Sequence, residues 1–222
     1  MKTFFFPLLP AITGCLLFIS AAHAQTNPAS LPAENDYGLL GKSYFAFDGG
    51  LIKYRNAPGS PTGLDTDLAL NLQASDNLDL GFGYDFIHAA NSNWKTSDQV
   101  GRFYGTGFVK LPNSAPYATA GVAYGWEHGS VAHNPGTRFH RSILDLGTGV
   151  EVPLIAQTSV CVGVDYDEAL RQPRPKDLSY QLALDLRFDD TFCTDVGADL
   201  QSGHNGTRDA VVYHAGLRIT FD

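Results

Sequence analysis

The stretch Val211-Val212-Tyr213-His214-Ala215-Gly216-Leu217-Arg218-Ile219-Thr220-Phe221 alternates between apolar residues and residues that are mostly small or polar. Side chains of a β-strand point in turn to its two faces, so this alternation predicts a strand with one apolar and one polar face. Such an apolar face packs against a second sheet in a soluble sandwich, or faces lipid in a bacterial outer-membrane barrel. The rest of the chain decides between these two folds.

Strand-like runs with this alternation recur from about residue 41 onward. They cover residues 42-55, 64-74, 78-88, 100-111, 116-127, 140-152, 157-168, 178-188, 192-202 and 209-221. The connections alternate between long and short, which is typical of a barrel whose two termini lie on the short-turn side. The sequence therefore predicts an all-β fold, a closed antiparallel transmembrane β-barrel of ten strands. A barrel of eight strands stays open as an alternative, because runs 100-111 and 116-127 carry aromatic residues on both faces.

Charged residues in these runs gather on one face. Asp65 and Asp67 alternate with the leucines of 64-72, and Asp165 and Asp167 alternate with Val164 and its apolar neighbours. Glycines share the charged face, as in a confined polar lumen, whereas a soluble sheet would expose scattered Lys and Thr to water. A secreted β-sandwich or a lipocalin-like barrel is the alternative interpretation.

The pattern resembles the small OmpA/OmpX-like barrels, whose last strand ends on an aromatic residue. Phe221 has that place here, although Asp222 follows it. The resemblance implies an integral protein in the outer membrane of a diderm bacterium, in contact with membrane lipid. Basic residues in the expected outer loops, Arg138, Arg171, Arg174 and Lys176, are expected to contact lipopolysaccharide phosphates.

The amino-terminal segment has the features of an export signal. Met1-Lys2 precedes an almost wholly apolar run, and Ala22-His23-Ala24 has the small-x-small form of a cleavage site. Alternatively, Ile12-Thr13-Gly14-Cys15 resembles a lipobox, which would make Cys15 a lipidated terminus. We expect the domains to be a signal peptide at 1-24, a periplasmic lead-in at 25-40 and the barrel at 41-222.

Composition excludes several classes of function. The formal net charge is −8, which argues against nucleic acid as a partner. Phosphate-binding loops, nucleophile elbows and Cys-x-x-Cys motifs do not occur, so no cofactor and no metal is expected. Cys161 and Cys193 lie two strands apart, about 9-10 Å, and should remain free thiols.

Two carboxylate pairs are weak catalytic candidates. Asp65 with Asp67 and Asp165 with Asp167 face inward on the second and seventh strands, opposite each other across a ten-stranded barrel and, by this interpretation, close to the loop-side rim. Paired carboxylates can activate water. The arrangement resembles that of the omptins, outer-membrane proteases that use an Asp pair opposite an Asp-His pair, but Asp167 stands where that histidine is required.

His140 and Ser142 form a second weak candidate. Their His-x-Ser spacing resembles that of outer-membrane lipid A deacylases, in which the histidine activates a lipid-facing serine. Ile143 replaces the asparagine of that family, and the nearby acid Glu151 falls on the other face of the strand.

The charged residues predicted to face the lumen indicate a charge cluster and a preference for cations. Arg187, Asp195 and Arg218 are predicted to form a charge cluster near the turn side, because unpaired buried charges are costly. Inward carboxylates outnumber inward bases, and acidic rings favour cations. The sequence thus favours a structural barrel or a narrow, weakly cation-selective passive pore. A protein without catalytic activity is favoured over an enzyme. The alternatives are an omptin-like or deacylase-like hydrolase, and an adhesin or ligand-binding barrel that uses its loops.

Overall fold

The computed structural model describes residues 39–55, 59–90, 94–131, 137–155, 157–170, 176–204 and 209–221. The signal peptide expected at 1-24 and most of the lead-in expected at 25-40 lie outside the described residues. Within the described residues, no helix is long and apolar enough to cross a membrane.

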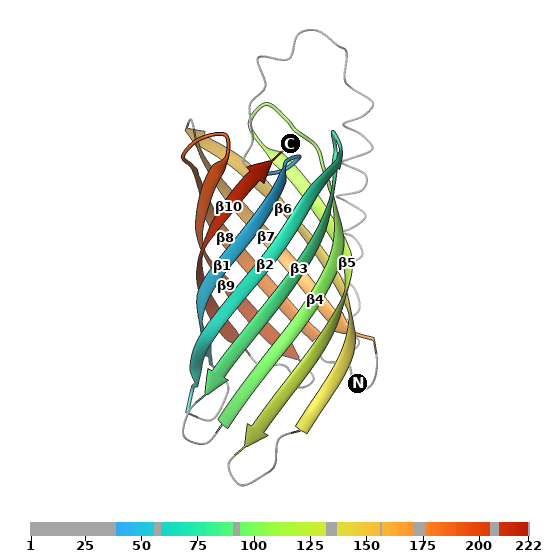
Figure 1. Cartoon of the computed structure of the whole chain (residues 1–222), viewed down its shortest axis with the longest axis vertical. Coiled ribbons are helices and arrows are strands. Elements are labelled where there is room, and N and C mark those ends of the chain that lie inside the picture. Colours follow the sequence, from blue (N-terminus) through green and yellow to red (C-terminus); the bar gives the residue numbers. More distant parts are fainter. Residues whose placement is uncertain are drawn as a thin grey trace, which may run out of the picture.

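Ten antiparallel strands form one closed barrel, which confirms the predicted fold and excludes the eight-stranded alternative (Figure 1). Each strand pairs with its sequence neighbours, and β1 closes on β10 from Ser43↔Phe221 to Tyr54↔Ala210. The strands are β1 (Ser43–Tyr54), β2 (Thr62–Ser75), β3 (Leu78–Ala90), β4 (Trp94–Phe108), β5 (Ala115–Val131), β6 (Thr137–Ile155), β7 (Thr158–Ala169), β8 (Lys176–Arg187), β9 (Phe192–His204) and β10 (Ala210–Phe221).

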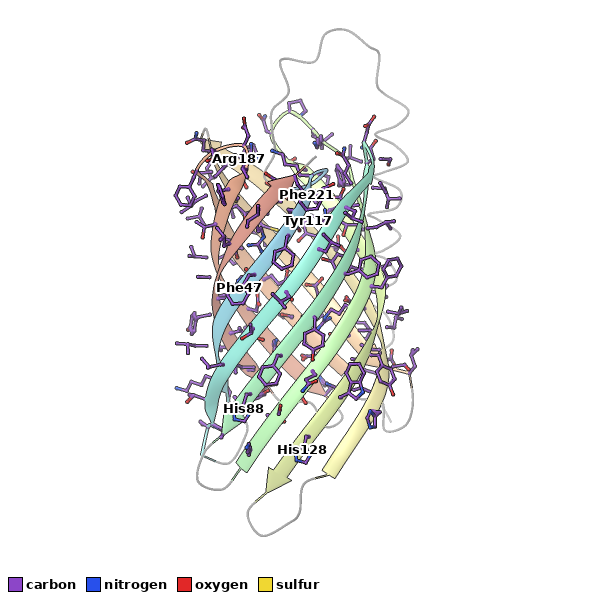
Figure 2. All side chains as sticks on the ribbon, in the orientation of Figure 1. Phe47, His88, Tyr117, His128, Arg187 and Phe221 are labelled. Atoms are coloured by element: carbon purple, nitrogen blue, oxygen red, sulfur yellow. The ribbon has the colours of Figure 1, made fainter. Side chains whose placement is uncertain are left out.

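The period-two pattern separates an apolar outer surface from a polar interior (Figure 2). Phe47, Leu64, Val122 and Leu182 point outward and expose more than half of their surface. Their neighbours along the strands, such as Asp48 and Asp65, point into the lumen. Exposing so much apolar surface is unfavourable in water, so this surface fits lipid.

Two of the predicted long loops are wrong, because strands occupy much of them. β4 begins at Trp94 instead of residue 100, β5 continues to Val131, and β6 begins at Thr137. Backbone pairing continues through these polar stretches, for example at Lys95↔Ala90 and Ser97↔His128. The part of a strand that extends beyond the lipid needs no apolar face. The polar residues that were interpreted as loops therefore indicate where the membrane ends, and not where the strand ends. In Figure 1, β5 and β6 extend past the other strands at the lower end.

At the opposite end the turns are short, as predicted. The turn after β8 is held by Asp189, whose Oδ1 accepts hydrogen bonds from the backbone N–H groups of Thr191 (2.8 Å) and Phe192 (2.7 Å). An Asp that bonds the backbone two and three residues ahead stabilises a tight reversal.

Candidate functional site

The lumen contains three adjoining cavities of about 330, 440 and 140 Å³. Asp65, Asp67 and Tyr104 line both of the first two. Arg102 and Asp167 line both the second and the third. Because each cavity shares walls with the next, the space extends from the turn side of the barrel toward the loop side.

Carboxylates dominate the walls of these cavities. Strand parity explains this, since every second residue of each strand must face the lumen. The acidic residues that line the three cavities are Asp48, Asp65, Asp67, Asp79, Asp85, Asp98, Glu127, Asp145, Glu151, Asp165, Asp167, Asp177, Asp185, Asp195 and Asp199. The basic side chains on the same walls are Arg102, Arg141 and Arg218, with His214.

Arg102 crosses the lumen toward the loop side. From β4, its Nε donates to Asp85 on β3 at 2.7 Å, and its Nη1 lies 3.1 Å from Asp145 on β6 and 3.2 Å from Asp167 on β7. One guanidinium therefore joins three carboxylates from different walls. Several charge-assisted hydrogen bonds fix its position, and the side chain narrows the passage.

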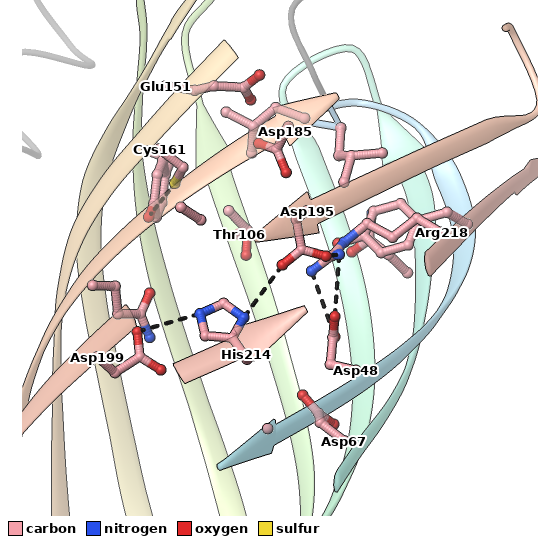
Figure 3. A pocket seen from close by; sticks show the side chains of 18 of the residues that line it. Asp48, Asp67, Thr106, Glu151, Cys161, Asp185, Asp195, Asp199, His214 and Arg218 are labelled. Carbon is pink, nitrogen blue, oxygen red and sulfur yellow. Dashed lines mark hydrogen bonds and ion pairs between the residues drawn. The ribbon is translucent and has the colours of Figure 1, made fainter. Parts of the chain in front are cut away.

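A second charge network lies at the seam where β1 meets β10 (Figure 3). Arg218 contacts both Asp48, at 3.2 Å, and Asp195. His214 lies between two carboxylates, with Nδ1 3.3 Å from Asp195 and Nε2 3.8 Å from Asp199. Asp195 is only 1% exposed, so the positive charge of Arg218 offsets its desolvation.

Two members of the predicted cluster of Arg187, Asp195 and Arg218 belong to this network. Arg218 does contact Asp195, but Arg187 lies opposite Cys193 in the register of β8 and β9. Asp48 and His214 were not assigned to the cluster from sequence. Pairing β1 with β10 would have found Asp48, because it lies directly beside Gly216, between His214 and Arg218.

Asp48, Asp195 and His214 also place three ligand atoms within 4.8 Å of one another, a geometry that a metal ion could use. The guanidinium of Arg218 already contacts both carboxylates and supplies the positive charge there. The residues therefore fit an ion-pair network better than a metal centre.

Residues 39–42 form a turn at the turn-side mouth, which we call the mouth turn (Leu39–Lys42). The N–H of Lys42 donates to the carbonyl of Leu39 at 3.2 Å, which closes a four-residue β-turn. Gly41, the third residue, has a φ of 76°, and a type II turn requires a positive φ at that position. Leu39 and Leu40 line the 330 Å³ cavity.

Three strands hold the mouth turn. The buried Asp79 on β3 accepts the N–H of Gly41 at 2.9 Å, and Asn71 on β2 donates to the carbonyl of Lys42 at 2.8 Å. Glu151 on β6, also buried, accepts a backbone hydrogen bond from Leu39. Since β3 and β6 are separated by two strands, the mouth turn extends over part of the opening. This contact was not foreseen from the sequence.

The four aspartates of the first catalytic hypothesis line one cavity from opposite walls, β2 and β7, as expected. They lie inside the lumen and not at its rim, since a further cavity with Tyr54, Asp98 and Glu127 extends on the loop side. Asp167 is bound by Arg102. No histidine is among the described residues that line the cavity shared by all four aspartates.

Ser142 points outward from β6, as predicted, and His140 points outward from the same strand. The His140 ring stacks on Tyr124 at 6.3 Å, and the carbonyl of Ser142 accepts the N–H of Leu170 at 2.9 Å. Glu151 faces the lumen, where Ser159 donates to it at 2.8 Å. The acid is therefore separated from the two outward residues by the barrel wall.

Both predicted free thiols are confirmed, since Cys161 and Cys193 form no disulfide. Cys161 faces the 330 Å³ cavity, with its Sγ 3.3 Å from the hydroxyl of Tyr117.

No protein-family model and no curated protein sequence matches this chain. Among solved structures, the β-domain of the Bordetella autotransporter BrkA aligns with a TM-score of 0.51 and 10% identity, covering 81% of this chain and 100% of that one. The translocator domain of the autotransporter NalP from Neisseria meningitidis aligns with a TM-score of 0.50 and 8% identity, covering 95% of this chain and 98% of that one.

This chain has the fold of an outer-membrane β-barrel. Its exposed apolar belt and closed hydrogen-bonded wall meet the requirements of a lipid environment, where every backbone polar group must be satisfied. The outer-membrane barrel predicted from the sequence is thus what the chain forms.

Proposed function

We propose that this outer-membrane barrel is a narrow passive pore for small cations. The observation that carries the proposal is the row of three adjoining cavities, whose walls present many more carboxylates than bases. Closely spaced acidic side chains in a confined passage attract cations and repel anions.

The dimensions of the lumen support slow conduction. The cavity on the loop side is the smallest of the three, at about 140 Å³. Beside it, one inner wall is filled by an apolar cluster of Ile52, Tyr54, Ala89, Ala210 and Val212. Arg102 and its three carboxylates narrow the same region. Small hydrated ions fit such a passage better than sugars or peptides.

The turn-side end is narrowed by the mouth turn. Leu39 and Leu40 line the cavity there, and the buried carboxylates of Asp79 and Glu151 hold the turn in place. The pore thus has two constrictions, one at each end of the carboxylate-lined space.

Neutralising the central carboxylates tests the proposal. The triple variant Asp65→Asn, Asp67→Asn and Asp165→Asn keeps the shape of the wall and replaces three ionisable carboxyl groups with neutral amides. In planar bilayers it should show a smaller cation preference than the wild type. Asp189→Asn and Asp190→Asn, at an exposed turn, should leave the preference unchanged. Equal selectivity of wild type and triple variant would contradict the proposal.

A further inference from the structure

A separate cavity of about 340 Å³ lies on the outside of the barrel, toward the loop side of β3 to β6. Its lining residues are Tyr84, Ser97, Gln99, Trp126, Glu127, His128 and His140. Gln99, Trp126 and His140 are direct cross-strand neighbours, and Ser97 is paired with His128. This outward face therefore combines aromatic rings with hydroxyl, amide and imidazole groups.

The walls of the cavity are held by contacts among these side chains. The hydroxyl of Tyr84 donates to Oε1 of Gln99 at 2.9 Å. Tyr124 packs edge-on against Trp126 at 4.9 Å and stacks on His140 at 6.3 Å. Such contacts limit rotamer freedom, so the groups are preorganised before anything binds.

An open strip leads from the cavity toward the apolar belt. Gly101 is the next outward residue on β4 after Gln99, and in register it lies between Tyr84 and Tyr124. A Cβ placed on Gly101 would meet nothing within 4 Å. The strip is therefore a gap between Tyr84 and Tyr124 on the outer surface.

Beyond Gly101, the outward surface becomes fully apolar. Phe103 lies on β4 with its ring 4.9 Å from that of Phe82, and Val122 beside it is 57% exposed. Along one line the surface thus offers a polar cavity, an open strip and an apolar band. This order matches a lipid with its head toward the loops and one chain along the barrel.

The chemistry of the cavity favours an uncharged, hydroxyl-rich head. Lys and Arg are absent from the described residues that line it, and the side chain of Glu127 belongs to the lumen, near Arg141. Hydroxyl, amide and imidazole groups donate and accept hydrogen bonds, and Trp and Tyr rings combine an apolar face with a polar edge.

We propose that this cavity and the strip at Gly101, together the outer groove, bind a glycolipid of the outer leaflet. Its sugar head occupies the cavity between Tyr84, Trp126 and His140, and one acyl chain runs over Gly101 toward Phe103. The groove is continuous with the lipid-facing belt, so the occupant comes from the membrane itself. This binding is independent of any conduction through the lumen.

Filling the strip tests the proposal. Gly101→Val adds a side chain where a Cβ has open space, and valine suits a strand, so the barrel should still fold. Gly49→Val is the matched control, because Gly49 also points outward with nothing within 4 Å of a Cβ, but it lies on β1 away from the groove. Trp126→Ala removes one wall of the cavity by a different route.

The probes are glucosyl-diacylglycerol and phosphatidylcholine with identical acyl chains, added to protein purified in a detergent without a sugar head. Native mass spectrometry should show the wild type and Gly49→Val retaining the glucosyl lipid in preference, and Gly101→Val and Trp126→Ala losing this preference by about tenfold. Equal retention of both lipids by the wild type, preference for phosphatidylcholine, or an equal loss in Gly101→Val and Gly49→Val would overturn the proposal.

Discussion

Arg102 is the residue that joins most walls of the lumen in the described structure, because its guanidinium binds carboxylates of β3, β6 and β7. Its removal would leave those carboxylates close together without a counter-charge. Arg102→Met should therefore lower the free energy of unfolding by about 2–3 kcal/mol, since breaking a largely buried ion pair leaves uncompensated charge.

Urea unfolding in lipid vesicles measures this loss. Lys176→Met is the control, because Lys176 pairs with Glu168 at 3.2 Å on the outer surface, where an ion pair contributes about 0–1 kcal/mol. Equal unfolding midpoints for the two variants would refute the role given to Arg102.

Gly63 shows why some inward positions tolerate no side chain. A Cβ on Gly63 would collide with the carbonyl oxygen of His88 and with the backbone of Ala89 on the neighbouring strand. Gly63→Ala should destabilise the barrel by about 1–3 kcal/mol, because backbone atoms cannot move aside as a side chain can. In the same unfolding assay, Gly49→Ala should show no loss, and a similar loss in both variants would contradict the argument.

At the scale of single elements, the mouth turn makes a specific prediction. Asp79→Ala removes the acceptor for Gly41 and should release the turn from β3. The thiol of Cys161 lines the cavity that Leu39 and Leu40 help to close, so it should react several-fold faster with a membrane-impermeant thiol reagent. Single-channel conductance should rise in parallel.

Asp76→Ala is the control for this experiment, because Asp76 lies in the exposed turn between β2 and β3. If Asp79→Ala is labelled faster but neither the wild type nor any variant conducts, the mouth turn is released as predicted and the pore proposal is wrong. Unchanged labelling in Asp79→Ala would show that the turn does not depend on Asp79.

The sequence predicted the strands well where lipid imposes alternation. All ten runs are strands, because a wall between lipid and a polar lumen requires an apolar residue at every second position. The extensions of β4, β5 and β6 were missed, because outside lipid the same hydrogen-bonded ladder carries polar residues such as Ser97 and Gln99. Polarity alone does not distinguish such strands from loops.

The lumen charges were predictable only in part. Strand parity gave their direction, but the partner of a long side chain depends on tilt and register across the barrel. Arg102 reaches Asp167, three strands away, and Arg218 reaches Asp48 across the closing seam. The mouth turn was missed because its polar backbone contacts, to Asp79 and Asn71, leave no periodic signal.

At the scale of the whole molecule, the outer surface of the barrel is apolar and the lumen-facing surface is charged. The outside exposes large apolar side chains such as Phe47, Leu51 and Leu64, and the inside carries charge on nearly every strand. The carboxylate-lined space inside supports the proposal that the barrel passes cations.

The most direct test of this account is the reversal potential of the purified wild-type barrel in a planar bilayer under a KCl gradient. We predict small channels whose reversal potential has the sign expected for cation selectivity, because carboxylates dominate the lumen walls. A correctly folded barrel that leaves the bilayer silent, or that prefers anions, would contradict the pore.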